Sequence, residues 1–184
     1  ADSDLLARRF AEAGYRLVKS AAKADVFVLN TCTVTANADA KARQALRAAH
    51  RANPQSIIVA TGCYAQRSSG DLAEVEGVSL VVGNSGKEQL PSMVTSFLSK
   101  RGAPANPPDV AGHDPMPQSN ATELVLTADR NRAMVKIQEG CNQVCAYCIV
   151  PKVRGRERSI SPDLLVEQIN DRVGQGYKEV VLTG

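Results

Sequence analysis

Tryptophan is absent from this sequence of 184 residues, and aromatic residues make up only 4% of it. This composition argues against a broad stacking platform for single-stranded nucleic acid. The formal net charge of +3 is too small to indicate a nucleic-acid partner by itself. No apolar run is long enough to cross a bilayer, and the polar start does not have the pattern of a signal peptide. We therefore expect a cytoplasmic protein with no membrane partner.

Histidine is also scarce, since His50 and His113 are the only two. They leave little room for a Ser-His-Asp arrangement. Cysteine occurs five times, an odd number that does not suit a secreted disulfide framework. In a reducing compartment, clustered cysteines are more often metal ligands or catalytic groups than disulfide partners.

Segments typical of strands and helices alternate over the first hundred residues. Helices are predicted at 4–13, 36–52 and 87–100, and strands at 15–18, 26–29, 57–60 and 80–82. This alternation predicts an α/β domain with a parallel sheet and helices on its faces, in Rossmann-like layers. The runs at 26–29 and 57–60 are continuously apolar, which is typical of strands buried on both faces.

Cys32 and Cys63 each follow one of these apolar strands, in predicted loops at the carboxyl ends. Ligands of parallel α/β sheets bind beyond those ends, so we expect the two cysteines to meet in space. A single cysteine is also often a small buried hydrophobic side chain, and for either residue alone this alternative stays open.

A proline-rich stretch separates this region from the rest of the chain. The predicted organisation is an N-terminal α/β domain at 1–101, a linker at 102–122 and a second domain at 123–184. In the second domain we predict strands at 123–127, 133–137 and 179–182 and a helix at 163–173. Strand, loop, helix and strand form one βαβ unit, which cannot close a domain alone. We expect it to begin a larger, TIM-like α/β barrel whose remainder is missing.

Three cysteines lie close together in a Cys-x₃-Cys-x₂-Cys pattern, at Cys141, Cys145 and Cys148. Soft thiolate ligands select zinc or iron–sulfur clusters. Structural zinc needs four protein ligands, and neither histidine has the required spacing. A ferredoxin run would have two-residue spacings and a fourth cysteine. Three thiolates on a 4Fe–4S cluster leave one iron open to a substrate or cofactor.

This pattern, with an aromatic residue before its last cysteine, resembles the signature of the radical S-adenosylmethionine superfamily. The resemblance implies that the open iron is chelated by S-adenosylmethionine, whose reductive cleavage gives a 5′-deoxyadenosyl radical that abstracts hydrogen from an unreactive C–H bond. It implies catalytic roles for Cys141, Cys145 and Cys148 and a cofactor-binding role for Tyr147.

Further segments resemble the methylthiotransferase family within that superfamily. They are 136–142, 148–151 and 154–159 around the cysteine loop, and 30–35 and 61–66 around the two earlier cysteines. The resemblance implies that Cys32 and Cys63 are two of three ligands of a second 4Fe–4S cluster, which supplies sulfur. The family's first auxiliary cysteine lies upstream of this chain, and its RNA-binding C-terminal domain is also absent. We therefore expect a fragment of a longer enzyme.

The segments 30–35 and 38–44 most resemble the branch that modifies N6-threonylcarbamoyladenosine beside the tRNA anticodon. The isopentenyladenosine branch follows closely, and the branch acting on a ribosomal-protein aspartate is less similar. The implied partners are tRNA and an electron donor such as a flavodoxin or ferredoxin. A non-catalytic iron–sulfur electron carrier and a zinc-binding interaction module are the alternatives.

A basic run follows the cysteine loop, at Lys152, Arg154, Arg156 and Arg158. Arginine suits both RNA phosphate and the carboxylate of S-adenosylmethionine, so Arg154 is a predicted cofactor-binding residue. A solvated loop explains the same run equally well.

Overall fold

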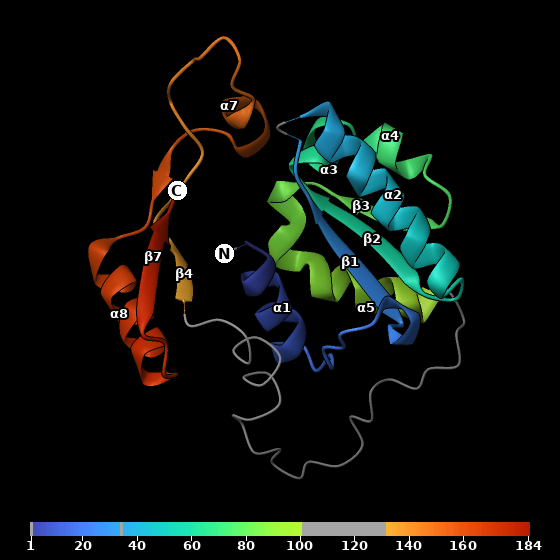
Figure 1. Cartoon of the computed structure of the whole chain (residues 1–184), viewed down its shortest axis with the longest axis horizontal. Helices are drawn as coiled ribbons and strands as arrows, with labels where there is room; N and C mark the ends of the chain where they lie inside the picture. Colours follow the sequence, from blue (N-terminus) through green and yellow to red (C-terminus); the bar gives the residue numbers. More distant parts are fainter. Residues whose placement is uncertain (1, 34, 101–131) are drawn as a thin grey trace.

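The computed structural model describes residues 2–33, 35–100 and 132–184 (Figure 1). The predicted linker at 102–122 and the predicted strand at 123–127 lie outside these residues. No helix in the described part of the chain combines the length and the apolar character needed to cross a membrane.

A three-stranded parallel sheet forms the centre of the first unit. Its strands are β1 (Val26–Thr31), β2 (Ile57–Gly62) and β3 (Val78–Val82), in the order β1-β2-β3. The predicted strands at 26–29, 57–60 and 80–82 are confirmed, each with extra residues. Every residue of β2 is buried, whereas β1 is an edge strand and most of its residues are half-buried.

Helices cover both faces of this sheet, as predicted. Alternate residues of β2 point to opposite sides. Ile58 packs with Leu46 of α2 (Ala36–Ala52), while Val59 packs with Phe10 of α1 (Asp2–Glu12). The remaining elements are the short helices α3 (Cys63–Arg67) and α4 (Ser69–Ala73), the helix α5 (Leu90–Lys100), and the 3-10 helices η1 (Ala21–Lys23) and η2 (Asn84–Gln89).

Two predictions in this unit are wrong. Residues 15–18 form no strand, because Tyr15 stays against the end of α1: its N–H donates to the Phe10 carbonyl and its ring meets the Phe10 ring edge-on. The last helix begins at Leu90 rather than at residue 87, since Asn84–Gln89 is a 3-10 helix. Pro91 lies in the first turn of α5, where proline leaves no helical hydrogen bond unmade.

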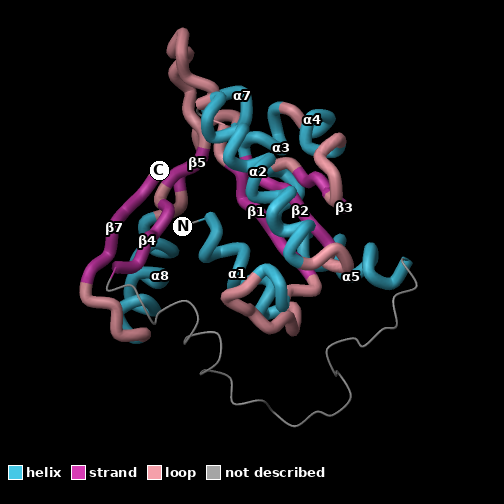
Figure 2. The backbone as a smooth tube through the Cα atoms, turned by 45° about the vertical axis from the view of Figure 1, so that its right-hand side comes forward, coloured by secondary structure: helices cyan, strands magenta, loops and turns pink. Residues whose placement is uncertain are grey.

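The second unit contains the predicted βαβ arrangement. Strands β4 (Arg132–Lys136) and β7 (Glu179–Thr183) pair in parallel, with α8 (Pro162–Gly174) between them in sequence. Figure 2 shows these strands as a sheet separate from β1–β3. Three short elements were not predicted: α7 (Val150–Arg154) and an antiparallel pair, β5 (Gln138–Glu139) with β6 (Arg158–Ser159).

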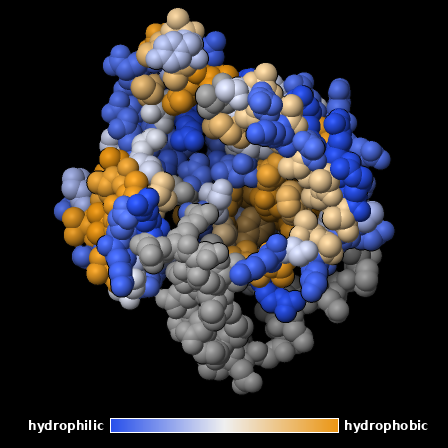
Figure 3. All heavy atoms as spheres, in the orientation of Figure 1, coloured by the Kyte–Doolittle hydropathy of each residue, from blue (hydrophilic) through white to orange (hydrophobic). Residues whose placement is uncertain are grey.

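Apolar side chains on this second unit lie open to solvent. Val166 and Val173 of α8 are 57% and 59% exposed, and Leu182 of β7 is 54% exposed. Figure 3 shows apolar residues gathered over α8. A single βαβ unit has too few neighbours to bury its own apolar faces, which agrees with a partial barrel.

Candidate functional site

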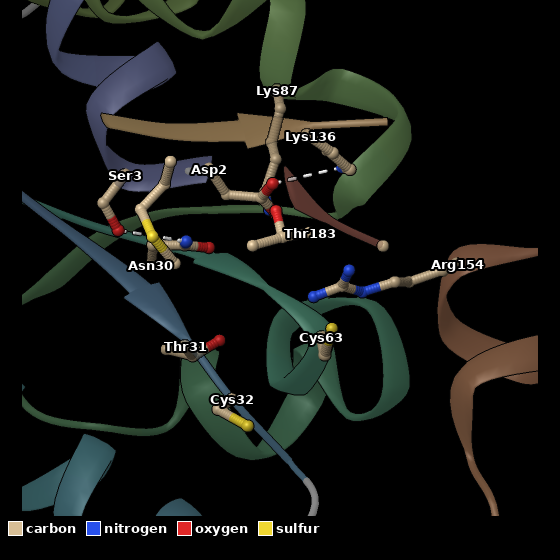
Figure 4. Close-up of a pocket in the computed structure, with 12 residues that line it drawn as sticks. Asp2, Ser3, Asn30, Thr31, Cys32, Cys63, Lys87, Lys136, Arg154 and Thr183 are labelled. Atoms are coloured by element: carbon tan, nitrogen blue, oxygen red, sulfur yellow. Dashed lines mark hydrogen bonds and ion pairs between the residues drawn. The ribbon is translucent and has the colours of Figure 1, made fainter. Parts of the chain in front are cut away.

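A cavity of about 370 Å³ lies where the carboxyl ends of the two parallel sheets face each other (Figure 4). Its wall includes Asp2, Asn30, Thr31, Cys32, Cys63 and Lys87 from the first unit, and Met134, Lys136, Arg154 and Thr183 from the second. This is the edge at which α/β sheets bind ligands, and the volume falls within the range of about 300–1,000 Å³ typical of small-molecule sites.

Cys32 and Cys63 both reach this cavity, as their positions after neighbouring strands predict. Thr31 of β1 is in register with Gly62 of β2, and each cysteine is the next residue along the chain. Cys32 is exposed, Cys63 is half-buried, and both are free thiols. One detail differs from the prediction: Cys63 is the first residue of α3 rather than part of a loop.

Gly62 makes the turn from β2 into α3 possible. Its φ of +100° belongs to a conformation that residues with a Cβ rarely adopt. A Cβ here would also lie 2.3 Å from the carbonyl oxygen of Thr31. The absence of a side chain at Gly62 therefore lets Cys63 come close to the end of β1, where Cys32 begins.

Two side chains from different parts of the chain contact Cys63. Arg154 of α7 reaches across the cavity toward Cys63 (Figure 4), and its interaction with the Cys63 side chain raises the pKa of the guanidinium further, against the opposing effect of burial. Asn84 of η2 places its amide nitrogen 3.8 Å from the same sulfur. The Cys63 sulfur thus faces donors from both units.

Asp2 joins the two units on another wall of the cavity. Its carboxylate lies 3.3 Å from the ammonium of Lys87 and 3.1 Å from that of Lys136 on β4. Burial alone would raise the pKa of Asp2, but the charge of Lys87 and the hydrogen bond and charge of Lys136 bring it below its ordinary value of 3.8. With Arg154, the cavity has three cationic side chains around one carboxylate, a balance that favours an anionic or thiolate-bound ligand.

Contacts between α2, which follows Cys32 in sequence, and α3, which begins at Cys63, also hold these two segments together. Arg67, at the end of α3, pairs with the buried carboxylate of Asp39 in α2. Arg43 of α2 donates to the hydroxyl of Tyr64, the residue after Cys63, and the guanidinium carbons of Arg43 and Arg67 lie 5.8 Å and 5.4 Å from the centre of that ring. These contacts fix α3, and with it Cys63, against α2.

The three-cysteine loop is held by backbone contacts. The N–H of Cys141 donates to the carbonyl of Gly155 at 3.1 Å, and the N–H of Cys148 donates to the carbonyl of Cys145 at 3.1 Å. The N–H of Gln143 donates to the Cys141 sulfur, with 3.4 Å between the nitrogen and the sulfur. Cys145 is exposed, while Cys141 and Cys148 are half-buried.

Gly140 brings this loop close to the segment that follows α7. Its φ is +76°, and a Cβ there would lie 2.2 Å from the carbonyl oxygen of Arg156. Nearby, the amide oxygen of Asn142 accepts from the N–H of Glu157. The loop is therefore anchored at its first end, and the cysteine side chains are left accessible.

The chemistry of the donors suits iron–sulfur clusters at both places. Within the described residues, no three Cys, His, Asp or Glu side chains are arranged around a point that could hold a single metal ion. In a 4Fe–4S cluster each thiolate binds a different iron, so its ligands need not converge on one point. Cys141, Cys145 and Cys148 provide three free thiols in one loop, and Cys32 and Cys63 provide two more at the cavity, which is the donor type that iron–sulfur clusters use.

The other predicted residues have different surroundings. Arg154 lines the cavity beside Cys63, whereas Tyr147 is 94% exposed and does not belong to the cavity wall. Asp2, Asn84 and Lys136 were missed by sequence reasoning. Each is a single polar residue whose partner lies far away in the sequence, and no local pattern indicates such a contact.

Family models match both units of the chain. Residues 1–83 match the uncharacterized protein family UPF0004, and residues 135–184 match the radical SAM superfamily. The second match contains the three-cysteine loop and the β4–α8–β7 unit.

Curated relatives extend over nearly the whole chain. It is 40% identical over 183 residues to the threonylcarbamoyladenosine tRNA methylthiotransferase MtaB of Aquifex aeolicus (strain VF5), and 39% identical over 183 residues to that of Bacillus subtilis (strain 168). It is 32% identical over 187 residues to the tRNA-2-methylthio-N(6)-dimethylallyladenosine synthase of Christiangramia forsetii. All of this chain is covered in each case, but only 44%, 40% and 38% of the respective relatives.

Proposed function

We propose that the chain is part of a radical S-adenosylmethionine methylthiotransferase, and that the full-length protein adds a methylthio group to a modified adenosine beside the tRNA anticodon. The two family-model matches and the relatives at 40% and 39% identity support this proposal. The observation that carries the proposal is the shared cavity, in which Cys32 and Cys63 of one unit face Arg154 of the radical unit. A transfer of sulfur to a radical site needs the two units side by side, and this cavity is lined by residues of both.

The proposed roles follow from the donor chemistry of each residue. Cys141, Cys145 and Cys148 hold one 4Fe–4S cluster, and Cys32 and Cys63 provide two ligands of the other. When bound, the first cluster and S-adenosylmethionine supply the radical that removes hydrogen from an unreactive carbon. The loop anchored at Gly140 presents its thiols on an accessible surface, as binding of a cofactor to one iron requires.

Arg154 and Tyr147 are the proposed cofactor-binding side chains. The guanidinium of Arg154 remains charged at every physiological pH and can bind a carboxylate through two N–H groups. The exposed ring of Tyr147 is free to pack against a ligand. An electron donor such as a flavodoxin or ferredoxin completes the proposed system.

The greater similarity to two threonylcarbamoyladenosine enzymes, at 40% and 39% identity against 32%, supports N6-threonylcarbamoyladenosine as the substrate base.

The proposed division of the chain is an auxiliary-cluster domain at 1–101, a linker at 102–122 and the start of a radical domain at 123–184.

The test is to express the full-length protein in a host that lacks its own methylthiotransferase and to analyse the tRNA nucleosides by mass. The expected result is a methylthio derivative of threonylcarbamoyladenosine that disappears in the Cys148→Ala variant. A methylthio derivative of isopentenyladenosine would move the protein to the other tRNA branch. No methylthio-nucleoside at all would contradict a tRNA substrate.

A further inference from the structure

Asn84 lies at the point where the two units meet. It is the first residue of η2, and its side-chain nitrogen is 2.7 Å from the carbonyl oxygen of Val153 in α7. The same nitrogen is 3.8 Å from the sulfur of Cys63. One carboxamide therefore contacts a backbone group of the radical unit and a candidate iron ligand of the other unit.

The partners determine how this amide is oriented. A backbone carbonyl can only accept a hydrogen bond, so the NH₂ group of Asn84, and not its oxygen, must face Val153. The NH₂ group carries two hydrogens. One is used by Val153, and the other is available to the sulfur of Cys63, where a longer contact is expected because sulfur is larger than oxygen.

The backbone of Asn84 is held by the helix that carries Cys63. The N–H of Asn84 donates to the side-chain oxygen of Gln66 at 2.9 Å, and Gln66 lies one turn after Cys63 in α3. This hydrogen bond ties the backbone of Asn84 to the helix that begins at Cys63. On the other side, Val153 is 5% exposed, and the next residue is Arg154, whose guanidinium points toward Cys63 across the cavity (Figure 4).

We propose that Asn84 is a positioning residue that sets the environment of the Cys63 sulfur and holds α7, with Arg154, at a fixed place across the cavity. The inference rests on the proposed function, because it takes Cys63 as a cluster ligand. An N–H donated to a ligating thiolate stabilises the more negative, reduced form of a cluster and so raises its reduction potential. Removal of the donor is expected to lower that potential.

The experiment uses the anaerobically reconstituted full-length protein with Cys141, Cys145 and Cys148 all changed to Ala, so that only the second cluster remains. Asn84→Leu removes both donors at nearly constant size. Asn84→Ser is a smaller polar replacement, too short to contact both partners, in case Leu prevents folding. Ser85→Ala, at the exposed neighbour in η2, is the matched control. The midpoint potential is measured by a redox titration followed by electron paramagnetic resonance.

Both Asn84 variants are expected to bind as much iron as the parent and to titrate at a more negative potential, while Ser85→Ala titrates with the parent. Parental potentials in both Asn84 variants would overturn the role of Asn84 and leave the proposed function intact. The Cys63→Ala variant tests the assignment of Cys63 as a cluster ligand separately from the role of Asn84. If this variant retains the iron and the signal of the parent, Cys63 is not a ligand. The cluster assignment then fails, together with the role of Asn84.

Discussion

The ammonium of Lys136 lies 3.1 Å from the Oδ1 atom of Asp2, and this ion pair connects β4 of the radical unit to α1. Both side chains are mostly buried, with 21% and 18% of their surfaces exposed. Lys136 also contacts Glu139 at 2.9 Å. The pair therefore helps to fix how the two walls of the cavity face each other.

A double-mutant cycle measures this connection. We expect Asp2→Asn and Lys136→Met to show a coupling free energy of about 1 kcal/mol or more, because partly buried pairs are less screened by water than exposed ones. The control is the pair Arg132–Glu179, whose side chains are 68% and 49% exposed and whose coupling should lie near zero. Equal coupling in the two pairs, measured by denaturant unfolding, would contradict the role of Asp2.

The acid dependence of this pair follows from the pKa of Asp2. The pKa is lowered in the folded state, so the stabilisation is complete above the ordinary value of 3.8 and is lost as the pH falls through the lower folded pKa. The difference in unfolding free energy between the native chain and Asp2→Asn should therefore stay constant from neutral pH to about pH 5. A difference that already shrinks near pH 6 would require a raised pKa instead.

Gly62→Ala tests the turn that places Cys63. The positive φ alone should cost about 1–3 kcal/mol, and the contact with the Thr31 carbonyl adds to this. Gly70→Ala is the control, since Gly70 lies in α4 with nothing near its would-be Cβ, and Ala there should be neutral or stabilising by up to about 1 kcal/mol. Thermal unfolding of both variants gives the comparison; similar melting temperatures would argue against a strained turn.

Asp39→Ala tests the support behind α3. Removal of one partner of a buried pair costs about 3–5 kcal/mol. Because the side chain of Arg67 is 38% exposed, we expect a smaller loss, of about 2 kcal/mol, in the free energy of unfolding. Glu88→Gln, in the more exposed pair with Arg9, should change stability by less than about 0.5 kcal/mol. The account of α3 fails if denaturant titration finds the two losses equal.

The sheet and the placement of two cysteines were predictable from the sequence. Continuous apolar runs that alternate with helices predict parallel strands, and the carboxyl ends of such strands necessarily share one edge. Cys32 and Cys63 follow two of these strands, so their meeting at the cavity required no knowledge of tertiary contacts.

The shortest strands and the single contacts that join the two units were not predictable in this way. Strands β5 and β6 have two residues each, too few for a period to be recognised. Asn84 and Asp2 act through single contacts with residues 69 and 134 positions away. The wrong prediction of a strand at 15–18 has a related cause. The segment has residues typical of strands, but its contacts with α1 leave it without a partner strand.

The most direct test of the account is electron paramagnetic resonance of the reduced full-length protein with Cys32 and Cys63 changed to Ala, recorded with and without S-adenosylmethionine. We predict about four iron and four sulfide per chain, a signal that S-adenosylmethionine alters, and loss of both in Cys148→Ala. A zinc-loaded protein without this signal, or a cluster whose signal is indifferent to S-adenosylmethionine, would contradict the open iron position at Cys141, Cys145 and Cys148.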